Sequence, residues 1–165
     1  MRLLKILAAG LLLGALPLGA NAGADLGGSI GSARVNNGDF QGSDTSYKLY
    51  LGSSYHEIIG GEVGYVNFGQ LGGNGPDAQA WNLAATIGIP YVFDFMTPYG
   101  KAGAAWEEVK GGTVSSEYKT EKPFYGVGLR FGSVRSPLGA RVEYERYTFR
   151  DQRLDLVSAG LEFRF

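Results

Sequence analysis

The sequence contains no cysteine among its 165 residues and only one histidine, His56. Without cysteine there are no disulfides and no thiolate metal sites, so the fold must be stabilised in another way. A single histidine cannot build a histidine-based metal site, and we expect neither a bound metal nor a cofactor. Acidic and basic residues nearly cancel, with a formal net charge of −1. The net charge of such a chain does not favour binding to nucleic acid.

Long apolar runs are also missing, except near the N-terminus. Two basic residues within the first five positions precede an apolar run over residues 6–18, and the small-x-small sequence ANA follows at 20–22. This order predicts a cleaved secretory signal peptide over residues 1–22. The run is shorter than the roughly 20 residues that a membrane-spanning helix needs. We therefore expect an exported chain over residues 23–165, which is the size of one domain.

The remaining sequence shows no helical periodicity. Short runs of alternating apolar residues are separated by clusters of Gly, Asn, Asp and Pro, which is typical of strands and turns. This alternation predicts eight strands, over residues 25–35, 45–54, 58–69, 80–92, 97–109, 122–132, 138–148 and 154–165. Tight turns (53–57, 93–96 and 133–137) alternate with mostly longer, polar connections (36–44, 70–79, 110–121 and 149–153). An even strand number with this alternation is typical of an outer-membrane β-barrel with both termini in the periplasm.

The two faces of the predicted strands indicate which solvent surrounds the barrel. Alternate residues of a membrane barrel face lipid, where Arg or Lys near the midplane costs about 2–4 kcal/mol. In the middle of the strands, charged residues and glycine share one phase and apolar residues the other. The inward charges predicted in this way are Lys48, Lys101, Arg130, Arg141 and Arg164, with Glu62, Glu143, Glu145, Glu162 and, near the rim, Glu107. The sequence therefore predicts an all-β fold: an eight-stranded, antiparallel, up-and-down transmembrane β-barrel with balanced charges inside.

Several residues near the strand ends do not follow this pattern. Arg34, Glu108, Arg146 and Asp155 break phase, but only at the predicted outer rim. Aromatic residues near the strand ends predict two girdles at the membrane interfaces. The periplasmic girdle would contain Tyr91, Phe93, Tyr99, Phe163 and Phe165, and the outer girdle Tyr65, Trp81, Trp106 and Tyr147.

Five segments carry a resemblance to a known family: GSIGSAR (28–34), GGEVGYVNFG (60–69), PYGKAG (98–103), GARVEYE (139–145) and GLEFRF (160–165). Together they resemble the OmpA-like transmembrane domain, the small outer-membrane β-barrel superfamily, along essentially the whole mature chain. The resemblance implies that the C-terminal aromatics Phe163 and Phe165 are the signal for the barrel-assembly machinery. It also implies an interior Glu62–Arg141 pair.

This sequence departs from the family at three interior positions. Ser29 and Thr86 stand where members often carry a basic residue, and Arg130 stands at an acidic position. The resemblance therefore implies a rewired charge network, and it carries over no gating behaviour.

Three functions fit this interpretation. An eight-stranded barrel is just wide enough for side chains to fill it. The balanced charges therefore favour a plugged interior and a structural role in envelope integrity or in surface interactions. A low-conductance, porin-like ion path is the alternative. An outer-leaflet lipid-modifying enzyme is disfavoured, because the G-x-S-x-G match at 27–31 lies inside a strand and His56 lies in a predicted periplasmic turn. We expect no enzyme.

Arg146, Arg150 and Arg153 cluster around the last predicted loop. Because the guanidinium fork suits phosphate, contact with lipopolysaccharide phosphates is a hypothesis, with a solvated loop as its alternative. The other expected partners are outer-membrane lipid and, during biogenesis, the barrel-assembly machinery and periplasmic chaperones. We expect a monomer.

Overall fold

The computed structural model describes residues 22–37, 40–56, 58–70, 77–89, 95–110, 120–132, 136–149 and 152–165. The predicted signal peptide therefore lies outside the described residues, apart from Ala22. Eight strands are present: β1 (Ala22–Asn37), β2 (Phe40–Tyr55), β3 (Ile59–Gln70), β4 (Asp77–Gly88), β5 (Met96–Lys110), β6 (Thr120–Phe131), β7 (Leu138–Phe149) and β8 (Gln152–Arg164). Within these ranges, no helix has the length and hydrophobicity needed to cross a membrane.

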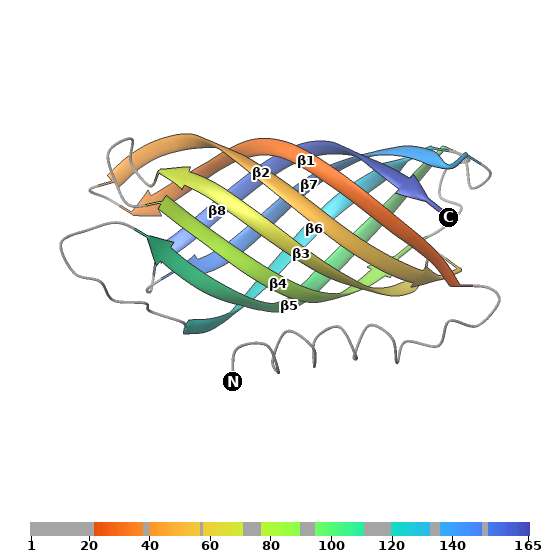
Figure 1. Cartoon of the computed structure of the whole chain (residues 1–165), viewed down its shortest axis with the longest axis horizontal. Helices are drawn as coiled ribbons and strands as arrows, with labels where there is room; N and C mark the ends of the chain where they lie inside the picture. Colours follow the sequence, from red (N-terminus) through yellow and green to blue (C-terminus); the bar gives the residue numbers. More distant parts are fainter. Residues whose placement is uncertain are drawn as a thin grey trace.

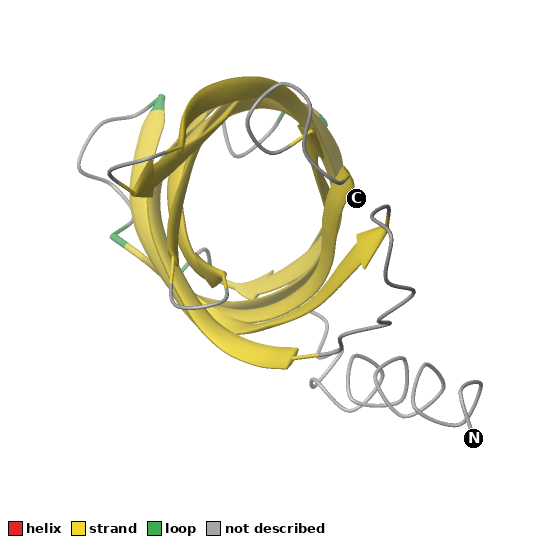
Figure 2. Cartoon of the chain, turned by 90° about the vertical axis from the view of Figure 1, so that its left-hand side faces the viewer, coloured by secondary structure: helices red, strands yellow, loops and turns green. Residues whose placement is uncertain are grey.

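Each strand pairs antiparallel with the next, and β1 pairs with β8, so the sheet closes into a barrel. Figure 1 shows the strands crossing the barrel obliquely, and Figure 2 shows the closed ring from one end. Two backbone hydrogen bonds between Ala24 and Phe165, of 3.0 and 3.1 Å, extend the β1–β8 ladder to the last residue. The fold confirms the predicted eight-stranded, antiparallel, up-and-down barrel.

The stagger of the strands is visible in their register. A path can be followed around the barrel from each residue to its partner on the neighbouring strand. Starting at Arg34 on β1, it passes through Asp155, Arg146, Tyr125, Ala102, Ala85, Gly61 and Ser53 and returns to β1 at Ala24. The path returns ten residues before its starting point. Closing a barrel requires such a stagger, and it tilts the strands by roughly 35–45° to the axis.

We name the two ends of the barrel after the parts of the chain that lie there. The terminal end carries the start of β1, the end of β8 and the β2–β3, β4–β5 and β6–β7 connections. The loop end carries the other four connections. His56 lies at the terminal end in the β2–β3 turn, with a φ of 52°. Ile58 N donates a hydrogen bond of 3.0 Å to Tyr55 O across that turn.

Some predicted boundaries were wrong. The expected polar loop over 36–44 is largely strand, because β1 reaches Asn37 and β2 begins at Phe40. Apolar alternation marks the part of a strand that faces an apolar environment, whereas the backbone ladder continues through polar residues beyond it. At the other end of the barrel, β4 stops at Gly88, before the predicted residue 92.

The predicted phase is confirmed along the strands. Outward residues such as Ile30, Leu49, Ile87, Val127 and Leu161 are each about 60% exposed. Two members of the predicted girdles point the other way: Tyr99 and Tyr147 are buried in the lumen, so their interfacial placement was wrong. Both share the phase of charged residues on their own strands, and this parity fixes their direction. Tyr91 and Phe93 lie outside the described residues.

Candidate functional site: the lumen of the barrel

Six charged side chains meet near the middle of the lumen, and we call them the charged layer: Lys48 on β2, Glu62 on β3, Lys101 on β5, and Arg141, Glu143 and Glu145 on β7. All six are almost completely buried. Strand alternation aims them inward, and the stagger brings residues from distant parts of the sequence to a similar depth. The layer holds three cations and three carboxylates, so its formal charges balance.

Each lysine of the charged layer contacts all three carboxylates. The distances to Glu62, Glu143 and Glu145, in that order, are 3.0, 2.8 and 3.1 Å from Lys48 Nζ and 3.1, 2.6 and 2.5 Å from Lys101 Nζ. Buried charges are tolerated only when they are well paired, because desolvation costs several kcal/mol per ion. Shared contacts of this kind supply that pairing.

Arg141 extends the layer towards the terminal end. Its Nη2 lies 2.8 Å from Glu62 Oε2, so these two side chains, which the family resemblance implies as a pair, are in contact. Its Nε donates a hydrogen bond of 2.7 Å to the Tyr99 hydroxyl, which in turn donates one of 2.6 Å to Glu143 Oε1. The guanidinium also lies 4.1 Å from the centre of the Tyr50 ring, a cation–π geometry.

Three of the remaining predicted interior charges lie closer to the terminal end. Arg164 Nη2 lies 2.5 Å from Glu162 Oε1, and Glu162 is buried while Arg164 is partly exposed. Arg130 is buried with its guanidinium 4.5 Å from the centre of the Tyr99 ring. Near the loop end, Glu107 is buried on the inward face of β5, as predicted.

The three carboxylates of the charged layer offer oxygens within 4.8 Å of one another. Three such groups close together are a common ligand set for a hard cation. Here two ammonium groups already lie among them at ion-pair distance, so the charge that would attract a metal is neutralised. The arrangement is that of an ion-pair network.

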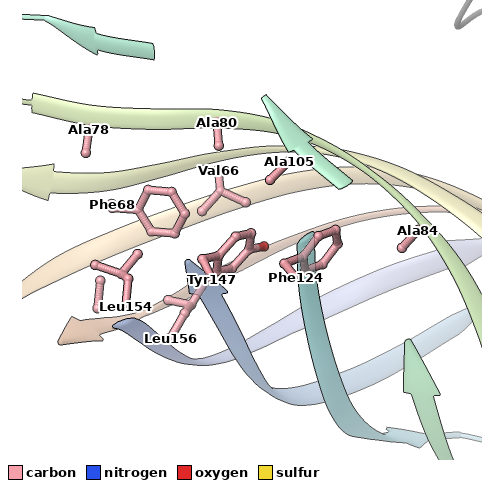
Figure 3. Close-up of a cluster of buried hydrophobic side chains, with 11 residues drawn as sticks. Val66, Phe68, Ala78, Ala80, Ala84, Ala105, Phe124, Tyr147, Leu154 and Leu156 are labelled. Carbon is pink, nitrogen blue, oxygen red and sulfur yellow. The ribbon is translucent and has the colours of Figure 1, made fainter. Parts of the chain in front are cut away.

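An apolar cluster occupies the lumen between the charged layer and the loop end. Figure 3 shows side chains of this cluster converging from several strands: Val66, Phe68, Ala78, Ala80, Ala84, Ala105, Phe124, Tyr147, Leu154 and Leu156. Ala33 also belongs to the cluster. Phe68 and Phe124 lie on either side of Tyr147, with ring centroids 5.0 and 4.8 Å from it. Sequence reasoning missed this cluster, although apolar residues at both phases near the loop ends of β3, β4 and β8 were the available signal.

Of the three arginines predicted to contact lipopolysaccharide, two are described. Arg146 forms a two-point ion pair with Asp155, at 2.6 Å from Nε to Oδ1 and 3.1 Å from Nη2 to Oδ2. Arg153 is exposed on β8. Arg150 and the side chain of Glu108 lie outside the described residues. Arg146 and Asp155, which both break the predicted phase, are thus paired with each other across β7 and β8.

The residues considered for catalysis do not come together. The G-x-S-x-G match lies within β1, where Ser29 points into the lumen and is buried. His56 is exposed in the β2–β3 turn at the terminal end, with its ring 4.3 Å from that of Tyr55.

A closed eight-stranded barrel with an apolar outer surface and charges inside defines the class of transmembrane barrels found in outer membranes. The chain belongs to the outer membrane protein beta-barrel domain family, which matches residues 6–165. This confirms the resemblance to small outer-membrane barrels and assigns the chain to the outer membrane of Gram-negative bacteria. The sequence matches none of the curated proteins.

Solved structures of similar fold include the following three. The N-terminal β-barrel domain of Pseudomonas aeruginosa OprF has a TM-score of 0.62 and 15% identity, covering 88% of this chain and 98% of that one. Ail, the attachment invasion locus protein of Yersinia pestis, solved with the heparin analogue sucrose octasulfate, has a TM-score of 0.60 and 16% identity, covering 88% and 99%. A de novo designed transmembrane β-barrel has a TM-score of 0.54 and 16% identity, covering 87% and 95%.

Proposed function

We propose that this chain is a structural barrel of the outer membrane whose lumen is closed by its own side chains, with the loop end facing the outside. The observation that carries the proposal is the filling of the lumen by two successive layers. Ions moving along the axis would meet the ion pairs of the charged layer and then the apolar cluster. The first barrier is electrostatic and geometric, and the second excludes water.

The proposed orientation rests on the connections. Outer-membrane barrels have short periplasmic turns and longer external loops. The longest connection, 111–119 between β5 and β6, lies at the loop end, whereas the terminal-end connections span 56–58, 89–95 and 132–137. The β1–β2 and β7–β8 connections at the loop end, 38–39 and 150–151, are only two residues long. With this orientation the start of β1 and the end of β8 lie in the periplasm.

The test is planar-bilayer recording of the purified, refolded protein beside a variant that opens the apolar cluster. Phe68→Gly combined with Phe124→Gly removes two buried rings from the loop half of the lumen. We expect the unchanged protein to be silent. The variant, once its heat-modifiable migration shows that it has folded, tests whether the charged layer closes the lumen without the apolar cluster: openings would assign the seal to the cluster, and silence would assign it to the charged layer. Steady, ion-selective openings of the unchanged protein would overturn the proposal.

A low-conductance ion path is the second candidate, and one observation favours it. Ser29, Ser46 and Ser158 have buried hydroxyls without a hydrogen-bond partner in the described part of the chain. Ser46 and Ser158 both pair with Gly31, so these hydroxyls lie along one side of the lumen. Buried hydroxyls normally find a partner, and water entering beside β1 would provide one. The same recordings separate a polar path from a closed lumen.

The proposal extends to biogenesis. Export would remove residues 1–22, and mass determination of the membrane-inserted protein checks that boundary. Phe163 and Phe165 are exposed on the outer surface at the terminal end, with ring centroids 5.8 Å apart. Their exposure makes them accessible to the barrel-assembly machinery, after escort by periplasmic chaperones. We expect Phe165→Ser to reduce the amount of assembled barrel in cells while the purified variant still refolds in detergent.

The proposed barrel is a monomer without catalytic activity. Overexpression followed by mass spectrometry of lipid A tests the second point, because an outer-leaflet lipid-modifying enzyme would change those masses. Sedimentation of the detergent-solubilised protein tests the first.

A further inference from the structure

The outer surface of the barrel differs between two sectors near the loop end. From β2 to β5 it carries exposed or half-buried aromatic rings: Tyr47, Tyr65, Trp81 and Trp106. The first three are in contact, with centroid distances of 6.4 Å from Tyr47 to Tyr65 and 5.2 Å from Tyr65 to Trp81. Aromatic rings at this position are the usual girdle of a membrane interface.

The sector formed by β7, β8 and β1 carries charges instead. Arg146, Asp155 and Arg34 are direct neighbours in the register, since Asp155 pairs with Arg146 on one side and with Arg34 on the other. Arg153 lies two residues before Asp155 on β8, towards the loop end and on the same outward face. We call these four residues the arginine row. It contains three cations and one anion.

The arginine row lies at interface depth. At a tilt near 45° and a strand spacing of about 4.8 Å, each step along the register moves roughly 3 Å along the axis. Arg146 is therefore about 7 Å deeper than Arg34, and the next step reaches the exposed ring of Tyr125. Charges facing lipid cost about 0–1 kcal/mol near the interface but about 2–4 kcal/mol at the midplane. The row is thus tolerated where headgroups are found.

The three arginines of the row differ in the hydrogen bonds and ion pairs that they form with other described residues. Arg146 is fixed by its two bonds to Asp155 and by a bond of 2.6 Å from Nη2 to the Tyr144 hydroxyl. Arg34 and Arg153 are exposed and form no hydrogen bond or ion pair with another described residue. Asp155 is the one anion of the row and forms its ion pair with Arg146, so the Arg34 and Arg153 guanidinium groups have no carboxylate at ion-pair distance among the described residues.

We propose that the arginine row binds the phosphate groups of a lipid headgroup, with Arg34 and Arg153 as its principal ligands and Arg146 as a fixed edge. Guanidinium forks match phosphate in geometry and charge. Arg34 and Arg146 are separated by one intervening strand, about 10 Å between backbones, which suits a headgroup that carries two phosphates better than a single ion. With the proposed orientation this lipid is lipopolysaccharide, so the proposal replaces Arg150 of the sequence-based hypothesis with Arg34.

The test titrates the full-length barrel in neutral detergent micelles with diphosphoryl lipid A and follows the bound lipid by native mass spectrometry. The variant R34Q/R153Q leaves the Arg146–Asp155 pair intact. The control K122Q removes one positive charge near the loop end of β6, from the inward phase. We expect the affinity for diphosphoryl lipid A to fall at least about tenfold in R34Q/R153Q and to stay unchanged in K122Q.

An unchanged affinity in R34Q/R153Q, or an equal loss in K122Q, would overturn the proposal, because binding would then follow overall charge. Inorganic phosphate at the same molar concentration should not displace the lipid; if it does, the row is a phosphate site and not a lipid site. Because the titration is done in micelles, its result depends on neither conductance nor orientation. Its failure is therefore distinguishable from failure of the proposed closed lumen.

Discussion

Tyr147 stacks flat on Phe124, with ring centroids 4.8 Å apart and ring planes 2° from parallel. The hydroxyl of the same tyrosine donates a hydrogen bond of 3.2 Å to Glu145 Oε1 and accepts one of 3.2 Å from Asn82 Nδ2. Its ring thus belongs to the apolar cluster and its oxygen to the charged layer. Tyr147 is the residue at which the two layers of the lumen are joined.

Tyr147→Phe tests the contribution of the hydroxyl separately from that of the ring. The ring and its stacking on Phe124 are kept, but Glu145 and Asn82 each lose a buried partner. Losing such hydrogen bonds costs about 1–3 kcal/mol. We expect the free energy of unfolding, measured by urea titration of the barrel in vesicles, to fall by that amount. Phe124→Ala, which leaves a cavity, should cost more, about 3–5 kcal/mol. A larger loss from Tyr147→Phe than from Phe124→Ala would contradict this assignment.

Lys101→Met tests the charge balance of the charged layer. The change leaves three buried carboxylates facing only Lys48 and Arg141, and removing one partner from buried pairs typically costs about 3–5 kcal/mol. Adding Glu145→Gln removes the carboxylate that lies 2.5 Å from Lys101 Nζ and restores a balance of two charges of each sign. We expect the double variant to regain part of the lost stability in the same urea titration.

Lys101→Met combined with Glu121→Gln is the matched control, since Glu121 is exposed on β6 away from the layer. This pair removes the same two charges from the chain without rebalancing the lumen. Recovery in the control as large as that with Glu145→Gln would show that overall charge, and not local pairing, sets the stability.

Much of the fold was predictable because membrane strands obey a strict parity. Once Lys48 was assigned inward, Leu49 had to face out, and every strand could be checked by the same rule. Parity could also have placed Tyr99 and Tyr147 correctly. They were assigned to the girdles because aromatic residues near strand ends are common at interfaces, and that statistical preference is weaker than the alternation of a strand.

The contacts inside the lumen were harder to predict from the sequence. Parity shows that Lys101 and Glu145 both face inward, but not that they meet, because the depth of each residue depends on the stagger of all eight strands. The apolar cluster was missed for a related reason. Phe124 and Leu154 share the inward phase near strand ends, and only the closed barrel shows that they fill one level of the lumen.

Gly103→Ala tests the tight curvature of the wall. A Cβ at Gly103 would collide with the backbone of β4, at the Leu83 carbonyl oxygen and 2.7 Å from Ala84 Cα. Backbone in a closed ladder cannot move away cheaply, and overpacking of this kind costs typically about 1–3 kcal/mol. Gly100→Ala, on the same strand, is the control, because its Cβ would come no closer than 3.9 Å to Gly126 O. We expect heat-modifiable migration to decrease for Gly103→Ala only, and equal behaviour of the two would refute the explanation.

Val127→Lys tests which surface faces lipid, and how deeply. Val127 is 60% exposed on the outer surface of β6, two residues from Tyr125 towards the terminal end, at the level expected for the membrane core. A lysine there should lower the free energy of unfolding in vesicles by about 2–4 kcal/mol. Thr45→Lys adds the same charge to the same outward phase of β2, nearer the loop end, where the cost should be about 0–1 kcal/mol. If both variants were equally stable in vesicles, the outer surface would not be immersed in lipid at the level of Val127. A loss at Thr45 as large as at Val127 would instead place the membrane core nearer the loop end than the aromatic rings and the arginine row indicate.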